Sequence, residues 1–154
     1  MTAFNSISMV LFDENDLHVK LLYPSATLPE KNHASDAAYD LKSIEDILIE
    51  PNSSQVVSTG IALTTPVGTY GQIAPRSGLS LKGLFVNAGV IDRGYTGEIK
   101  VILFNFGKSI IDLPRGSRIA QLIIHKIASP DVVQVEDLPI VDSRLDSGLG
   151  SSGI

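Results

Sequence analysis

Short runs of β-branched and aliphatic residues, separated by glycine and proline, constrain the fold of this 154-residue chain more than any other feature. Four runs have the composition of strands: 55–63, 99–104, 119–127 and 132–138. The run 99–104 is apolar enough to be buried on much of both faces. No long segment has the periodicity of an amphipathic helix, and 80–84 fits at most one helical turn. Short strands between turn residues predict an all-β sandwich or barrel.

One domain is predicted, because the length fits a single domain and no repeat or linker interrupts the pattern. Hydrophobic residues make up 44% of the chain, which is enough for a packed core. We expect the β domain to span residues 18–142. Residues 1–17 precede it as an N-terminal extension. Residues 143–154 are expected to form a mobile glycine-rich C-terminal arm, because glycine and serine replace the apolar anchors there.

Composition excludes several classes of function. The chain has no cysteine, so disulfides, thiolate zinc sites and cysteine nucleophiles are excluded. Its net charge of −5 argues against stable nucleic-acid binding. No apolar run approaches the length of a membrane span, and the start lacks the basic region of a signal peptide. We therefore expect an intracellular protein of the cytoplasm or nucleus, with no membrane association.

Five short segments concentrate the side chains that could do chemistry. They are SDAAYDL at 35–41, PRSGL at 75–79, GVIDRGYTGE at 89–98, RGSRIAQL at 115–122 and RLDSGLGSSG at 144–153. Together they hold carboxylates, arginines, glycine-flanked serines and a tyrosine. These groups are suited to binding a nucleoside triphosphate through a metal ion and directing a water molecule at it.

Taken singly, these residues have plainer interpretations. Asp92 stands near two glycines, which is typical of a turn aspartate that bonds its own backbone, although a carboxylate there could also act as a general base. Arg76-Ser77-Gly78 is either a polar turn or a phosphate clamp, with a charge, a hydroxyl and an open backbone N–H. Gln121 lies on an apolar strand, so it needs a hydrogen-bond partner with or without a catalytic role.

In this order the five segments resemble the motifs of the trimeric dUTPases, over about residues 20–153. The resemblance implies a β-barrel or jelly-roll-like fold and hydrolysis of dUTP to dUMP and pyrophosphate. That reaction limits uracil incorporation in DNA and supplies dUMP for dTMP synthesis. The resemblance further implies a Mg²⁺ cofactor and a homotrimer whose active sites are shared between subunits.

The resemblance also implies roles for individual residues. Asp92 would activate the water that attacks the α phosphorus, and Gln121 would lie near the α phosphate and that water. Ser77 would contact the oxygen bridging the α and β phosphates. Asp40 would hold Mg²⁺ through a water molecule, and Tyr95 would pack on the deoxyribose and exclude a 2′-hydroxyl. The other implied substrate-binding residues are Arg76, Gly78, Asn87, Gly89, Val90, Ile91, Lys100, Arg144, Leu149, Gly150, Ser151 and Ser152.

Three residues depart from the family pattern: Leu149 replaces an aromatic ring, Ser117 an aspartate and Ala38 a glycine. They bear on rate and tail closure rather than on the reaction class. Two alternatives stay open. A dCTP deaminase of the same fold would release ammonia from dCTP, and a non-enzymatic nucleotide-binding regulator would bind dUTP without releasing pyrophosphate.

Overall fold

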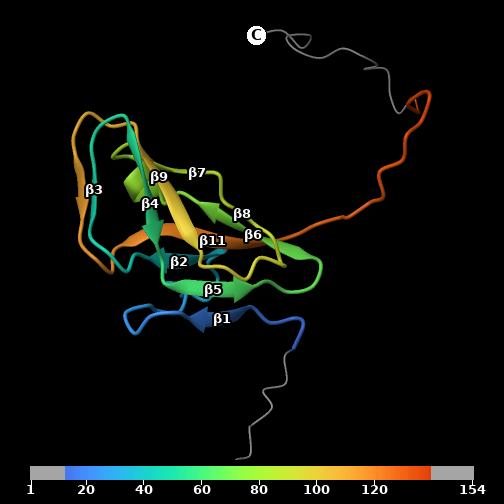
Figure 1. Cartoon of the computed structure of the whole chain (residues 1–154), viewed down its shortest axis with the longest axis horizontal. Helices are drawn as coiled ribbons and strands as arrows, with labels where there is room; N and C mark the ends of the chain where they lie inside the picture. Colours follow the sequence, from blue (N-terminus) through green and yellow to red (C-terminus); the bar gives the residue numbers. More distant parts are fainter. Residues whose placement is uncertain (1–12, 140–154) are drawn as a thin grey trace, which may run out of the picture.

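A computed structural model of the protein describes residues 13–139 (Figure 1). Among these residues, short strands follow one another with a single four-residue helix between them. The elements are β1 (His18–Leu21), β2 (Ala38–Lys42), β3 (Ile47–Ile49), β4 (Ser53–Ser58), β5 (Ile61–Thr64), β6 (Thr69–Ala74), α1 (Ser77–Ser80), β7 (Leu84–Asn87), β8 (Val90–Ile91), β9 (Lys100–Asn105), β10 (Ile111–Leu113) and β11 (Arg118–Lys126). The predicted all-β class is confirmed.

All strand pairs are antiparallel, and they form four small sheets within the described residues. The largest has the order β2-β11-β6-β8, a second has the order β4-β9-β7, and β1 pairs with β5 and β10 with β3. The long strand β11 is central to the largest sheet. Its register sets Gln121 opposite Asp40 on β2 and opposite Ala74 on β6. Two of the predicted functional segments therefore lie on paired strands, and a third, 75–79, begins directly after β6.

The core is built from alternate residues of these strands, as the period of two in a strand requires. Its largest fully buried side chains are those of Leu41, Ile47, Ile49, Val57, Ile61, Leu84, Ile99, Val101, Leu103, Asn105, Ile119 and Leu122. On β9, Val101 and Leu103 are buried whereas Ile102 is 36% exposed. The prediction that much of both faces is buried holds only for the inner face within one chain, because the outer face does not meet the core.

The predicted strand over 55–63 is interrupted. β4 ends at Ser58 and β5 begins at Ile61, because the backbone at Gly60 adopts a positive φ of 73°. A Cβ at Gly60 would lie 2.8 Å from the Cβ of Ala26, so the close packing also requires glycine. By contrast, the predicted strand over 119–127 is confirmed as β11, one residue earlier at each end.

The segment 132–138, predicted as a strand, has no strand conformation. It runs away from the other strands in Figure 1, and Val132, Val133 and Leu138 are exposed. A strand needs a neighbour for its backbone hydrogen bonds, and this segment has none among residues 13–139. The expected helical turn is also shifted: α1 begins at Ser77 and ends at Ser80, and a turn follows. No helix in the described part of the chain is long and apolar enough to cross a membrane.

Candidate active site

A pocket of about 810 Å³ opens where β2, β11 and the segment between β6 and α1 meet. Five of the residues predicted from the sequence line it, namely Asp40, Arg76, Ser77, Gly78 and Gln121. The structure adds residues that sequence reasoning did not select: Asn32, Asp36, Ala37, Leu79, Lys82 and Ile123. Asp36 and Ala37 stand in the first functional segment and Leu79 in the second, whereas Asn32, Lys82 and Ile123 lie outside all five segments.

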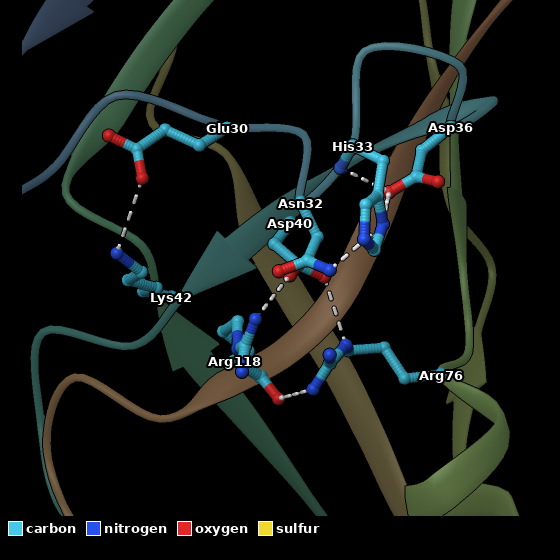
Figure 2. A network of polar contacts seen from close by, with 8 residues as sticks. All are labelled: Glu30, Asn32, His33, Asp36, Asp40, Lys42, Arg76 and Arg118. Carbon is cyan, nitrogen blue, oxygen red and sulfur yellow. Dashed lines mark hydrogen bonds and ion pairs between the residues drawn. The ribbon is translucent and has the colours of Figure 1, made fainter.

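Asp40 is held between two arginines in this pocket region (Figure 2). Its Oδ1 lies 2.9 Å from Arg76 Nε and its Oδ2 lies 3.2 Å from Arg118 Nη1. Arg76 Nη1 also donates to the backbone carbonyl of Arg118 at 3.1 Å. One carboxylate thus orients two guanidinium groups, and the three side chains together keep a positive charge that can attract a phosphate group.

Gln121 has the partner that its strand position requires. Its Nε2 donates to the carbonyl of Pro75 at 2.8 Å, which connects β11 to the residue before Arg76. The amide oxygen has no hydrogen-bond donor among the described residues, so it can accept from a water molecule or a substrate. Gln121 therefore fits both a structural and a catalytic role, because its amide N–H stabilises the loop and its amide oxygen is free to accept a hydrogen bond.

Ser77 and Gly78 form the exposed start of α1. No heavy atom lies within 4 Å of the position that a Cβ would take at Gly78. Packing within the chain therefore does not require glycine here. The missing side chain leaves the backbone open on the pocket side, as a phosphate clamp needs.

A second group of predicted residues lies along the hairpin from β7 to β8. Asn87 ends β7, and the turn passes through Ala88 and Gly89 with positive φ angles of 61° and 115°. A Cβ at Gly89 would lie 2.6 Å from the carbonyl oxygen of Ile73, so no other residue fits without a shift of backbone. The amide of Ile73 in turn donates to the carbonyl of Gly89 at 2.8 Å.

Beyond β8, a smaller pocket of about 260 Å³ contains the predicted base and the predicted sugar contact. Its lining residues are Val56, Val90, Ile91, Asp92, Tyr95, Glu98, Lys100 and Ile102. The Asp92 carboxylate is exposed and has no hydrogen-bond or ion-pair partner within residues 13–139. It is therefore available to a water molecule.

The two pockets share no lining residue. Asp40 lies on β2 and Ile91 on β8, at opposite edges of the largest sheet. The registers place three strand spacings of about 4.8 Å and three residues of about 3.4 Å between them, on the order of 17 Å in total. One chain thus gathers the residues of the predicted phosphate clamp in one pocket, and Asp92 and Tyr95 in another.

Five predicted residues lie outside the part of the chain that the structure describes: Arg144, Leu149, Gly150, Ser151 and Ser152. Ser117 donates from its hydroxyl to the carbonyl of Pro114 at 2.6 Å, so it closes a turn and brings no carboxylate to Arg118. Ala38 begins β2 and does not have a positive φ, so its backbone does not require the glycine that it replaces.

Metal binding would depend on few protein groups. Among residues 13–139 no group of three or more His, Cys, Asp and Glu side chains could hold a metal ion. A magnesium ion that keeps most of its waters and binds phosphate oxygens does not need such a group. Each oxygen of Asp40 contacts one guanidinium nitrogen and retains capacity to accept another hydrogen bond. Asp40 therefore fits a contact through water.

Comparisons with known proteins agree on one family. The dUTPase family model matches residues 24–153. The deoxyuridine 5'-triphosphate nucleotidohydrolase of Saccharomyces cerevisiae is 44% identical over 146 residues, which cover 94% of this chain and 99% of the yeast protein. Staphylococcus bacteriophage 80alpha dUTPase, solved with dUPNHPP, gives a TM-score of 0.85 at 34% identity and covers 91% of this chain and 99% of its own.

A mutant dUTPase from phage phi11 of S. aureus, described with the coordination of a structural Mg(II) ion, gives a TM-score of 0.75 at 31% identity. That match covers 80% of this chain and 99% of the phage chain. The range matched by the family model spans all five motif segments, including the fifth at 144–153. The chain belongs to the dUTPase family.

Proposed function

We propose that this protein is a dUTP diphosphatase, which hydrolyses dUTP to dUMP and pyrophosphate. The observation that carries the proposal is the single pocket lined by Asp40, Arg76, Ser77, Gly78 and Gln121. The names of the relatives give the substrate, since the yeast relative is a deoxyuridine 5'-triphosphate nucleotidohydrolase. The proposed substrate also implies an intracellular location, because deoxynucleoside triphosphates are made and used inside cells.

The triphosphate binds at the larger pocket. Arg76 supplies charge, and Ser77 donates to the oxygen between the α and β phosphates. Negative charge develops on that oxygen as pyrophosphate departs, so a hydroxyl donor there stabilises the transition state more than the ground state. The ion pair with Asp40 fixes the direction of the Arg76 guanidinium before the substrate arrives, which reduces the entropy lost on binding.

Asp92 acts as the general base. It accepts a proton from a water molecule while the water oxygen forms a bond to the α phosphorus, and the bond from that phosphorus to the bridging oxygen breaks. The amide oxygen of Gln121 helps to orient the same water. Tyr95 lies against the deoxyribose, and Asn87 with the neighbouring hairpin backbone reads the uracil. Gly89, Val90, Ile91 and Lys100 complete this side of the site.

Mg²⁺ is the proposed cofactor, and it would neutralise charge on the triphosphate when bound. Asp40 would hold it through water, because each of its carboxylate oxygens can accept a further hydrogen bond. The structural Mg(II) ion of the phage phi11 relative supports the choice of metal without locating it in this chain. Arg144, Leu149, Gly150, Ser151 and Ser152 would close over the bound nucleotide.

The proposed assembly is a homotrimer with shared active sites. Asp92 and Ser77 must act on one α phosphate, yet their pockets are separate in one chain. A neighbouring subunit that presents its Asp92 hairpin to the larger pocket would complete the site. Two exposed apolar regions are available for burial in contacts between subunits. They are the outer face of β4 and β9, with Val56 and Ile102, and the segment 132–138.

A direct assay tests the proposal. The full-length protein is incubated with dUTP, UTP or dCTP, with Mg²⁺ or with excess chelator, and the nucleotide products, pyrophosphate and ammonia are measured. We expect stoichiometric dUMP and pyrophosphate from dUTP, with a strong dependence on Mg²⁺. Ammonia from dCTP would favour the deaminase alternative. Tight binding of dUTP without any product would favour the regulator and contradict catalysis.

A further inference from the structure

The ring of Tyr95 is held by contacts within its own loop. Tyr95 is 46% exposed, and its hydroxyl donates to the backbone carbonyl of Glu98 at 3.1 Å. This bond folds the side chain back along the chain, so that the ring lies directly over Gly97. Tyr95 does not belong to a strand, so no regular ladder fixes the position of its backbone.

Gly97 provides the surface against which this ring lies. A Cβ built at Gly97 would lie 2.5 Å from the Tyr95 hydroxyl oxygen and 2.7 Å from Cζ. Ordinary contacts between carbon atoms are about 3.5–4.0 Å, so the ring would have to move by about 1 Å to admit a methyl group. Gly97 does not have a positive φ, so its backbone conformation is open to other residues. The position of the ring, rather than the backbone, requires glycine.

The segment beneath the ring is itself fixed. One carboxylate oxygen of Glu98 accepts a hydrogen bond from the amide of Gly60 at 3.0 Å, and the other lies 3.8 Å from Lys100 Nζ. The Glu98 side chain is only 15% exposed. These contacts connect the loop to the junction of β4 and β5, where the backbone of Gly60 is constrained by close packing. The carbonyl that receives the Tyr95 hydroxyl therefore has a defined position.

We infer that Gly97 is a positioning residue for sugar selectivity: by lacking a side chain, it sets the depth at which the Tyr95 ring meets the sugar. The inference rests on the proposed function, in which this ring excludes a 2′-hydroxyl. A ring displaced by about 1 Å opens space on one side and loses contact with the deoxyribose, and displacements of this size can be costly in an active site. Selectivity for dUTP over UTP then depends on a residue that touches neither sugar.

The test is a double-mutant cycle on the ratio of kcat/KM for dUTP to that for UTP. It compares the wild type, Gly97→Ala, Tyr95→Ala and the double variant. Gly94→Ala is the matched control, since Gly94 lies in the same loop, has no positive φ and has no heavy atom within 4 Å of its Cβ position. We expect Gly97→Ala to lower the ratio at least about fivefold, within the coupling that touching residues show. Gly94→Ala should leave it unchanged.

In the Tyr95→Ala background, Gly97→Ala should have no further effect on the ratio, because the ring that it displaces is gone. An unchanged ratio in Gly97→Ala, or an equal loss in both backgrounds, would overturn the inference. The ratio of Kd values for dUMP and UMP, measured by calorimetry on the same variants, gives a reading independent of turnover. A protein that leaves dUTP intact would refute the proposed activity, while the Kd cycle would still decide the role of Gly97.

Discussion

At the scale of single residues, Asp92 is the sharpest prediction. Asp92→Asn keeps the shape of the side chain and can still orient a water, but it cannot accept the proton. We expect kcat to fall at least about 10²-fold, the lower range for a general base, with little change in the affinity for dUTP. Asp131→Asn, which removes an exposed carboxylate outside both pockets, is the control. A kcat above half of the wild-type value would remove Asp92 from this role.

A substitution of Asp40 tests the proposed contacts with the triphosphate and with Mg²⁺. Asp40→Asn removes the charge that holds Arg76 and Arg118 together, so both guanidinium groups lose their shared partner. We expect a higher KM for dUTP and a higher Mg²⁺ concentration for the half-maximal rate. The matched control is Glu30→Gln, which breaks the neighbouring exposed contact of 3.8 Å with Lys42. The measurement is the rate of dUTP hydrolysis at increasing Mg²⁺ concentration. An unchanged Mg²⁺ dependence in Asp40→Asn would exclude the metal contact.

At the scale of elements, the outer face of β9 is predicted to be an interface between copies. Ile102 points away from the core, so Ile102→Lys should leave the fold of the chain intact while placing a charge in the interface. We expect weaker association in sedimentation experiments, and association is the deciding measurement because Ile102 also lines the pocket that contains Asp92 and Tyr95. Val67→Lys, at a turn residue that is 53% exposed, is the control. A trimer that persists in Ile102→Lys down to low protein concentration would show that this face is not buried.

The sequence predicted elements well where local composition decides them. β11 follows from its run of aliphatic residues, and the all-β class follows from the turns between runs. The prediction was wrong where distant packing decides. Gly60 breaks a continuous β-branched run because Ala26 packs against it, and 132–138 has the composition of a strand but no partner strand in the described chain. Neither cause is visible in a local window.

The candidate site was likewise only partly predictable from the sequence. Its residues were found through motifs, and their roles remain predictions. Their contacts could not be predicted, because Asp40 and Arg118 are separated by 78 residues and meet only through the register of β2 with β11. The support of Tyr95 by Gly97 was also missed, although both belong to one segment, because glycine in a turn has many ordinary explanations.

At the scale of the whole molecule, sharing a site between subunits has a measurable consequence. Every site would need the phosphate clamp of one copy and the Asp92 hairpin of another. Two inactive variants with defects in different halves could then complement each other, since some sites in a mixed assembly would receive two intact halves. A site built within one chain has no such possibility, because each variant chain keeps its own defect.

The decisive mixture combines Ser77→Ala with Asp92→Asn in equal amounts, unfolded and refolded together. Random assembly into closed, heterologous trimers gives each site an intact clamp and an intact hairpin in about a quarter of cases, so about a quarter of wild-type activity should appear. Either variant refolded alone should stay inactive. A second mixture pairs the wild type with the double variant. Shared sites again give about a quarter, whereas sites within one chain give about half in this mixture and none in the first.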